Sequence, residues 1–299
     1  MHWRAPTWTV RFALIAVLPM LSAQQDAAAA GNEESPPRIE IVGASVSAGF
    51  VDGPLTGGSS DNRSVPLLRV VQSWLGDTEV QVRSSADLML FQDAEGRAPR
   101  QIERALKRDP QLALAVDFLF WFGYGYVRKG EDGEQAARLR RLELGLELLD
   151  RLPCPIVVGD LPDVHGAERR MISPRQIPDV EILDALNARL AAWAAERPRV
   201  RVFPLRALVA EMKEKGVALP CAEGAVQVRP GGLMQGDKLH ATRLGMAYLG
   251  FVLQDHVRAA LPEAERAFVP AAAFEAFVQA ADAGADLELM AEATAPAGR

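Results

Sequence analysis

The sequence predicts an α/β fold of three layers, in which a parallel five-stranded sheet lies between two layers of helices. Short apolar runs rich in β-branched residues alternate about five times with longer segments of helical spacing. Several of these runs are apolar on both faces, as strands in the centre of a parallel sheet are. The chain has 299 residues, 49% of them hydrophobic, and is therefore long enough to bury such a core.

Each element of this pattern can be placed on the chain. The expected strands are Ile39–Gly43, Glu79–Arg83, Leu114–Phe122, Pro155–Gly159 and Val200–Phe203. Helical spacing indicates a helix after Pro66, a charged helix beginning near Glu134, a helix from Ile182 to Trp193 and a closing helix over Ala241–Leu261. Beyond Pro262 the composition predicts one further helix at Ala271–Ala281 and then a frayed tail.

The N-terminus has the pattern of a secretory signal peptide over residues 1–30. A basic segment precedes the apolar stretch Phe12–Ala23, which is too short to cross a membrane, and small residues follow it. An uncleaved anchor is the alternative, which Pro19 and the short span disfavour. We expect an exported protein, periplasmic or secreted, without stable membrane insertion after cleavage. Its main domain would cover residues 31–262, with a helical extension and tail over 263–299.

Charge and cysteine usage narrow the possible partners. The formal net charge is −6, which gives no electrostatic footprint for nucleic acid or an anionic membrane surface. Cys154 and Cys221 could pair in an oxidising compartment, although two buried free thiols are the favoured interpretation. No cysteine and histidine cluster has zinc spacing and no EF-hand loop is present, so we expect no metal.

Ser45 is the first candidate for chemistry. The first expected strand leads directly into the sequence GASVSAG at residues 43–49, where small residues let the backbone turn sharply and let a substrate approach a hydroxyl. Ser45 could instead serve only as a helix N-cap. The segment is neither the dinucleotide motif G-x-G-x-x-G nor the elbow G-x-S-x-G, because Ser47 occupies the place of the second glycine of the elbow.

Asp237 and His240 form the second candidate, at the entry to the closing helix. A carboxylate three residues before an imidazole can fold back and accept a hydrogen bond from the ring. That bond would fix the tautomer of His240 and support the imidazolium formed when the ring takes a proton from a serine. Alternatively, Asp237 acts only as a cap.

Together these two blocks resemble the SGNH, or GDSL-type, hydrolase family over roughly Arg38–Val257. GASVSAG stands where the family has G-D-S-x-S-x-G, and DKLH followed by ATRLGMAYLG matches its last block. The resemblance implies an α/β/α fold with a flavodoxin-like five-stranded sheet. It also implies Ser45 as nucleophile, His240 as general base and Asp237 as the residue that orients it, without a cofactor.

The middle blocks of the family are altered in this chain. By position, Ala86 replaces a glycine of the second block, whose backbone N–H helps bind the oxyanion. Gly125 replaces the oxyanion asparagine of the third block and Tyr126 its aspartate, and Ala44 replaces the aspartate of the first. The resemblance therefore implies an oxyanion hole made by the N–H groups of Ser45 and Ala86, with Gly125 as a weakened third corner. Tyr124 and Tyr126 are candidates for the substrate pocket.

These observations predict an exported serine esterase that acts through an acyl-serine intermediate on a carboxylic ester, of lipid or carbohydrate O-acyl type. Losing one preorganised oxyanion donor typically lowers turnover by about 100- to 1000-fold. Two alternatives remain: a non-catalytic binding protein on the same fold, and an extracellular O-acyltransferase. The partner would be a small-molecule, glycan or lipid ester, and the sequence leaves the oligomeric state open.

Overall fold

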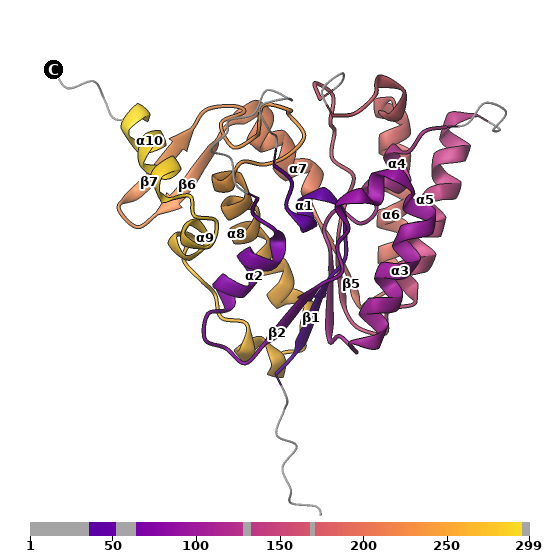
Figure 1. Cartoon of the computed structure of the whole chain (residues 1–299), viewed down its shortest axis with the longest axis horizontal. Coiled ribbons are helices and arrows are strands. Elements are labelled where there is room, and N and C mark those ends of the chain that lie inside the picture. The colour runs from indigo at the N-terminus through magenta and orange to yellow at the C-terminus, as the bar shows by residue number, and fades with distance from the viewer. Residues whose placement is uncertain (1–35, 52–63, 128–132, 168–170, 295–299) are drawn as a thin grey trace, which may run out of the picture. The chain divides into compact units, whose positions relative to one another are not determined.

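The computed structural model describes residues 36–51, 64–127, 133–167 and 171–294 (Figure 1). The expected signal peptide lies outside these residues and stays a prediction. Within the described ranges, no helix combines the length and the apolarity needed to cross a membrane. The two cysteines of these ranges are free; Cys154 is buried, and burial raises the pKa of its thiol to about 11.

The central sheet has five parallel strands in the order β2-β1-β3-β4-β5, which confirms the predicted fold class. The strands are β1 (Arg38–Ile41), β2 (Gln81–Ser84), β3 (Leu112–Ala115), β4 (Ile156–Gly159) and β5 (Val200–Phe203). In this doubly wound order, the direction in which successive strands are added to the sheet reverses between β1 and β3. Ligands of such sheets bind at the carboxyl ends of the strands flanking that point.

Strand side chains alternate between two hydrophobic cores. Ile39, Ile41 and Leu114 pack into one core, whereas Ala113 and Ala115 pack into the other. All of them are buried, which explains why β3 is apolar on both faces.

Helices cover both faces of the sheet, and Figure 1 shows the two groups on opposite sides. One layer contains α3 (Ala94–Lys107), α4 (Phe120–Tyr124), α5 (Glu134–Asp150) and α6 (Val180–Ala195). The other contains α2 (Leu67–Leu75), α7 (Leu205–Ala210), α8 (Arg243–Ala260) and α9 (Phe274–Ala280). The predicted helices after Pro66, from Glu134, through Ile182–Trp193 and over Ala241–Leu261 correspond to α2, α5, α6 and α8.

The third strand is shorter than predicted. β3 ends at Ala115, and the aromatic part of the expected strand Leu114–Phe122 instead enters the helix α4. The rings of that segment are buried in the core beneath α3, α5 and α6. A short, uniformly apolar run does not distinguish a buried strand from a buried helix by periodicity, and this is why the prediction was wrong.

The second half of the chain contains further elements that the sequence analysis did not identify. An antiparallel hairpin, β6 (Val217–Cys221) and β7 (Gly224–Val228), follows the π-helical turn η4 (Glu211–Lys215). The expected frayed tail is largely the helix α10 (Gly284–Thr294), anchored where Arg243 of α8 pairs with Asp286 at 3.0 Å. Phe277 of α9 is buried against Trp74 of α2, with ring centroids 6.0 Å apart.

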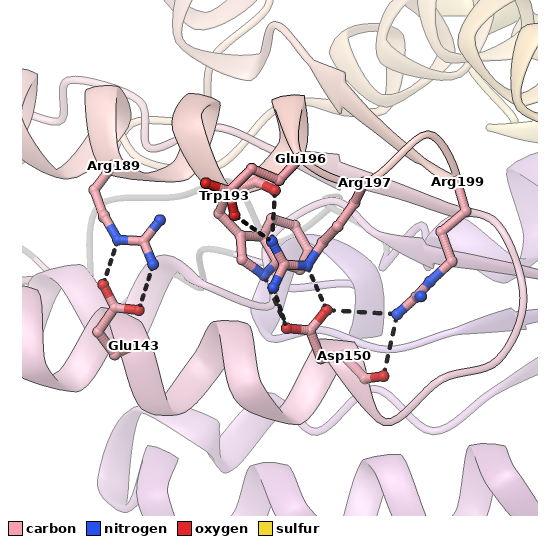
Figure 2. Close-up of polar contacts among 7 residues, drawn as sticks. All are labelled: Glu143, Asp150, Arg189, Trp193, Glu196, Arg197 and Arg199. Carbon is pink, nitrogen blue, oxygen red and sulfur yellow. Dashed lines mark hydrogen bonds and ion pairs between the residues drawn. The ribbon is translucent and has the colours of Figure 1, made fainter.

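Helices α5 and α6 are joined by ion pairs on their outer side (Figure 2). Arg189 binds Glu143 through two hydrogen bonds of 2.5 and 2.8 Å. Arg197 binds both oxygens of Asp150 at 2.6 and 2.8 Å, and the indole N–H of Trp193 donates to the same carboxylate at 3.1 Å. Bidentate guanidinium–carboxylate pairs are the stronger kind of surface ion pair.

Replacing Asp150 with Asn is expected to reduce the loss of folding stability that occurs as the pH is lowered into the acid range. Hydrogen bonds from Arg197 lower the pKa of Asp150, with Trp193 and the charge of Arg199 acting in the same direction against burial. Because the pKa is lower in the folded chain, this stabilisation is present above the unfolded pKa of about 4 and is lost as pH falls through the folded value. Melting temperatures of the two proteins should therefore differ at pH 7 and converge toward pH 2.5. A constant difference over this range would contradict the prediction.

Candidate active site

Ser45, His240 and Asp237 meet at the carboxyl end of β1. Ser45 begins the short helix α1 (Ser45–Ala48), and the other two lie in the turn before α8. Nε2 of His240 lies 2.8 Å from the Ser45 hydroxyl, 195 residues away along the chain, and Nδ1 lies 2.7 Å from Oδ2 of Asp237. These are the distances of a serine–histidine–aspartate triad, and a serine in this arrangement can be activated as a nucleophile.

Asp237 is held in place by its own turn. It is fully buried, and its second oxygen, Oδ1, accepts hydrogen bonds from the backbone N–H groups of Leu239 at 2.9 Å and His240 at 3.0 Å. Burial alone would raise the pKa of Asp237, but the bonds and charge of His240 outweigh it, so the net pKa lies below its usual value. Asp237 therefore caps the turn and also orients the imidazole as a carboxylate.

One face of the His240 imidazole is covered by Phe50. The two rings stack with centroids 4.1 Å apart and an interplanar angle of 27°. Gln235 fixes this arrangement, since its side-chain amide donates to the carbonyl oxygens of Phe50 at 3.1 Å and Ala241 at 2.7 Å. Phe50 follows the GASVSAG segment directly, but nothing in the sequence marks it as a partner of His240.

A buried carboxylate, Asp117, holds the turn that carries Ser45. Its Oδ1 accepts from the N–H of Ala44 at 3.0 Å and the hydroxyl of Ser47 at 2.6 Å. Its Oδ2 accepts from the N–H groups of Val46 at 2.7 Å and Ser47 at 3.3 Å. An ionised carboxylate offers about four acceptor positions, and the turn uses all four. Asp117 is not among the residues predicted for the site, although a lone acid in an apolar run at a strand end is a usable signal.

Gly43 is clamped from the opposite side by Gln101 of α3. The Gln101 side chain accepts from the Gly43 N–H at 2.8 Å and donates to its carbonyl oxygen at 3.0 Å. A side chain at position 43 would not fit, because its Cβ would lie 2.2 Å from Oδ1 of Asp117. Glycine is thus required by the close approach of Asp117.

A narrow apolar cavity opens beside the triad. It has a volume of about 40 Å³ and is lined by Ser45, His240 and Asp117 together with apolar side chains. The apolar lining consists of Val46, Phe120, Pro162, Leu205, Leu208, Val209, Met212, Met234, Leu239, Ala241 and Leu249. Apolar walls with a few convergent polar groups are typical of a site for a small ligand.

The predicted oxyanion residues lie in different places. The N–H of Ser45 has no acceptor among the described residues, whereas the N–H of Ala86 donates to the Ser84 hydroxyl at 3.2 Å, and Ala86 does not line the cavity. Gly125 lies beyond α4 in a separate hollow, where its carbonyl accepts from Arg138 at 3.1 Å. The third corner was therefore misplaced: because the chain turns into α4 after Ala115, the residue beside the nucleophile is Asp117. No asparagine or glutamine occurs among the described residues lining the cavity.

The two tyrosines predicted for the substrate pocket lie in different environments, and neither lines the cavity beside Ser45. Tyr124 is buried, its hydroxyl donates to the carbonyl of Pro162, and burial raises its pKa far above the usual value. Its ring stacks on Phe120, with centroids 4.3 Å apart, so it supports the cavity wall from behind and does not reach the cavity itself. Tyr126 is 57% exposed and lines the same hollow as Gly125.

In the part of the chain that the structure describes, no group of three or more histidine, cysteine, aspartate or glutamate side chains is arranged to hold a metal ion. The candidate catalytic residues beside the cavity are Ser45, His240 and Asp237. Their arrangement suits transfer of an acyl group to Ser45, since the base lies within hydrogen-bond reach of the nucleophile.

No family model and no curated protein matches the chain. Among solved structures it is similar to a psychrotrophic esterase, EstA, from Pseudoalteromonas sp., with 12% identity, TM-score 0.45, and 75% of this chain and 97% of that chain covered. It is also similar to a GDSL-like lipase from Bacteroides thetaiotaomicron, with 14% identity, TM-score 0.45 and coverages of 80% and 96%. For a catalytic mutant of the acetylxylan esterase Axe2 from Geobacillus stearothermophilus, these values are 13%, 0.47, 75% and 94%.

The chain spans 46% of the length of a further similar structure, a gut microbial diltiazem-metabolizing enzyme, at 10% identity and TM-score 0.45. The assignments of fold and site rest on this chain's own strand order and side-chain distances. In the doubly wound order of its sheet, and in a serine after β1 that meets an aspartate–histidine pair before the last long helix, the chain resembles a divergent SGNH/GDSL-type hydrolase.

Proposed function

We propose that this protein is an exported serine hydrolase of carboxylic esters that acts through an acyl-serine intermediate. The observation that carries the proposal is the continuous hydrogen-bonded series from Ser45 through His240 to Asp237, opening onto an apolar cavity. Export is supported by the sequence of residues 1–30 alone.

In the first half of the reaction, the Ser45 oxygen attacks the ester carbonyl carbon while Nε2 of His240 takes the hydroxyl proton. The tetrahedral intermediate then collapses, the bond to the alcohol oxygen breaks, and His240 returns the proton to the leaving alcohol. Water repeats these steps on the acyl-serine, releasing the carboxylic acid and restoring Ser45. Asp237 stays ionised throughout and stabilises the imidazolium, in keeping with its lowered pKa.

The oxyanion would be bound first by the N–H of Ser45, the donor of this turn that Asp117 does not occupy. The N–H of Ala86 could join it once released from the Ser84 hydroxyl. With no side-chain amide lining the described cavity, we expect turnover about 100- to 1000-fold below that of a site with one more donor.

The size of the cavity favours a short acyl group. A volume of about 40 Å³ holds three or four water-sized groups, at roughly 10–15 Å³ for each. The apolar walls suit the hydrocarbon part of the acyl group, and the polar atoms of Ser45 and His240 lie where its carbonyl would be. An acetyl to butyryl group fits these dimensions.

The proposal predicts stoichiometric labelling of Ser45 by a fluorophosphonate, because the probe reports an activated serine even where turnover is slow. Intact mass and peptide mapping would locate the adduct. Ser45→Ala should abolish both labelling and the hydrolysis of p-nitrophenyl acetate. Ser64→Ala is a matched control, since Ser64 is an exposed serine whose hydroxyl binds the carbonyl of Gly49, and it should label as the parent does.

Absence of labelling in the folded protein would contradict the hydrolase proposal. That result would favour the second candidate function, a non-catalytic binding protein on the same fold. The observation in its favour is the carboxylate of Asp117 beside the nucleophile, in a described cavity without an amide donor.

A further inference from the structure

A second hollow, of about 260 Å³, lies at the same edge of the sheet and is not used by the proposed chemistry. Its aromatic lining consists of Phe91, Trp121, Phe122 and Tyr126. Phe91 and Tyr126 are 49% and 57% exposed, which is unusual for such large apolar groups, and the rings of Phe91 and Trp121 lie 5.9 Å apart. We call this hollow, with its aromatic and polar lining, the aromatic hollow.

The polar part of the aromatic hollow contains a hydrogen-bond donor, the side-chain NH₂ of Gln176, that no described residue uses. Gln176 is nine-tenths buried, and its side-chain oxygen accepts from the backbone N–H of Ser173 at 3.0 Å. Its NH₂ group has no acceptor among the described residues, and the side chain lines the hollow. The fully buried side-chain atoms without a partner among the described residues do not include this nitrogen, so it is open to the hollow and can donate to a ligand bound there.

Hydrogen-bond donors and acceptors surround the aromatic rings. Arg141 and Glu95 face each other at 3.7 Å across the hollow, the first able to donate and the second to accept. An exposed aromatic face suits the C–H face of a sugar ring, and planar guanidinium, carboxylate and amide groups suit its hydroxyls. A purely apolar chain would cover these polar groups without offering them any hydrogen bond.

The aromatic hollow adjoins the catalytic cavity. Phe120 lines the cavity and Trp121 lines the hollow, and their rings pack edge to face with centroids 4.9 Å apart. Phe91 lies on η2 (Leu88–Gln92), whose N-cap Asp87 donates its N–H to the carbonyl of Gly43, just before the nucleophile. One wall of side chains thus separates the place of the acyl group from the aromatic hollow.

We propose that the aromatic hollow is a subsite for a sugar residue, and hence that the substrate is an O-acylated oligosaccharide whose alcohol portion extends over Phe91 and Tyr126. This inference rests on the proposed function, because the sugar would be the alcohol side of the same ester. The acyl group would occupy the small cavity, and Gln176 would donate to a sugar hydroxyl oxygen.

Direct binding tests the subsite without requiring turnover. The full chain carrying Ser45→Ala would be titrated calorimetrically with hexasaccharides of β-1,4-linked glucose, xylose and N-acetylglucosamine, and with hexaethylene glycol as a flexible polyether of similar length. We expect saturable binding of at least one sugar and none of the polyether. Phe91→Ala should weaken this binding at least tenfold. Gln176→Glu should do the same, because it keeps the oxygen that accepts from Ser173 but removes the donor.

Leu289→Ala is the matched control, since Leu289 is another exposed large apolar residue, on α10 outside the hollow, and it should bind as the parent does. Failure of all three sugars to bind would overturn the subsite, as would binding that neither variant weakens or binding shared with the polyether. Sugar binding without fluorophosphonate labelling of Ser45 would retain the subsite and remove the hydrolase. Labelling without sugar binding would do the reverse.

Discussion

Replacing Asp237 with Asn is expected to lower ester turnover and fluorophosphonate labelling by about 10³- to 10⁴-fold. The reason lies in how the carboxylate is used. Its Oδ1 accepts two backbone N–H groups, so the single oxygen of an asparagine would stay at that position and its NH₂ would face Nδ1 of His240. The imidazole would then carry its proton on Nε2, toward Ser45, and could not act as the base.

The control for this variant is Asp163→Asn, which makes the same change in another aspartate–histidine pair. Asp163 lies 2.6 Å from His165, both side chains are partly exposed, and neither residue lines the cavity beside Ser45, so the variant should retain turnover within about twofold. Equal losses in the two variants would contradict the assigned role of Asp237. The lowered pKa of Asp237 means that its charge also stabilises the fold at neutral pH. Melting temperatures of the variants would therefore show whether lost turnover reflects lost catalysis or lost folding.

The triad could be predicted from the sequence because its parts are local or obey a topological rule. Asp237 and His240 are three residues apart in one turn, so their contact needs no knowledge of the remaining chain. Ser45 follows the first strand, and the carboxyl ends of parallel strands converge at one edge of the sheet. Both facts are visible in the order of residues, and the structure brings these three side chains within hydrogen-bond distance.

The third block could not be placed in the same way. The run from Leu114 to Phe122 has no periodicity that reveals the end of β3 at Ala115. Because the strand was predicted to end too late, Gly125 and Tyr124 were wrongly assigned to the site. Partners that act across the fold, such as Gln101 on Gly43 and Phe50 on His240, depend on how helices and loops pack. The aromatic hollow likewise combines residues from η2, α4, α5 and the short helix η3 (Pro174–Gln176), which no local pattern connects.

Replacing Asp117 with Ala should lower the free energy of unfolding by about 3–5 kcal/mol, because two buried N–H groups, one half-buried N–H group and a buried hydroxyl would lose their acceptor. For a chain of this size such a loss corresponds to roughly 8–15 °C in melting temperature. Asp184→Ala is the matched control: Asp184 is 57% exposed and pairs with Arg206 on the surface, so its loss should cost less than about 1 kcal/mol. An unchanged melting temperature for Asp117→Ala would exclude this structural role.

Asp117→Asn separates two effects that the carboxylate could have on catalysis. Its negative charge lies beside the developing oxyanion, so neutralising it could speed the attack by Ser45. Against this, an amide has one acceptor oxygen where the turn uses two, and the position of Ser45 relative to His240 depends on that turn. Because all four acceptor positions of Asp117 are filled by the turn, its charge is already balanced by local N–H and O–H dipoles. Labelling of the folded Asp117→Asn protein should therefore be slower than that of the parent, and faster labelling would show that the charge outweighs the positioning.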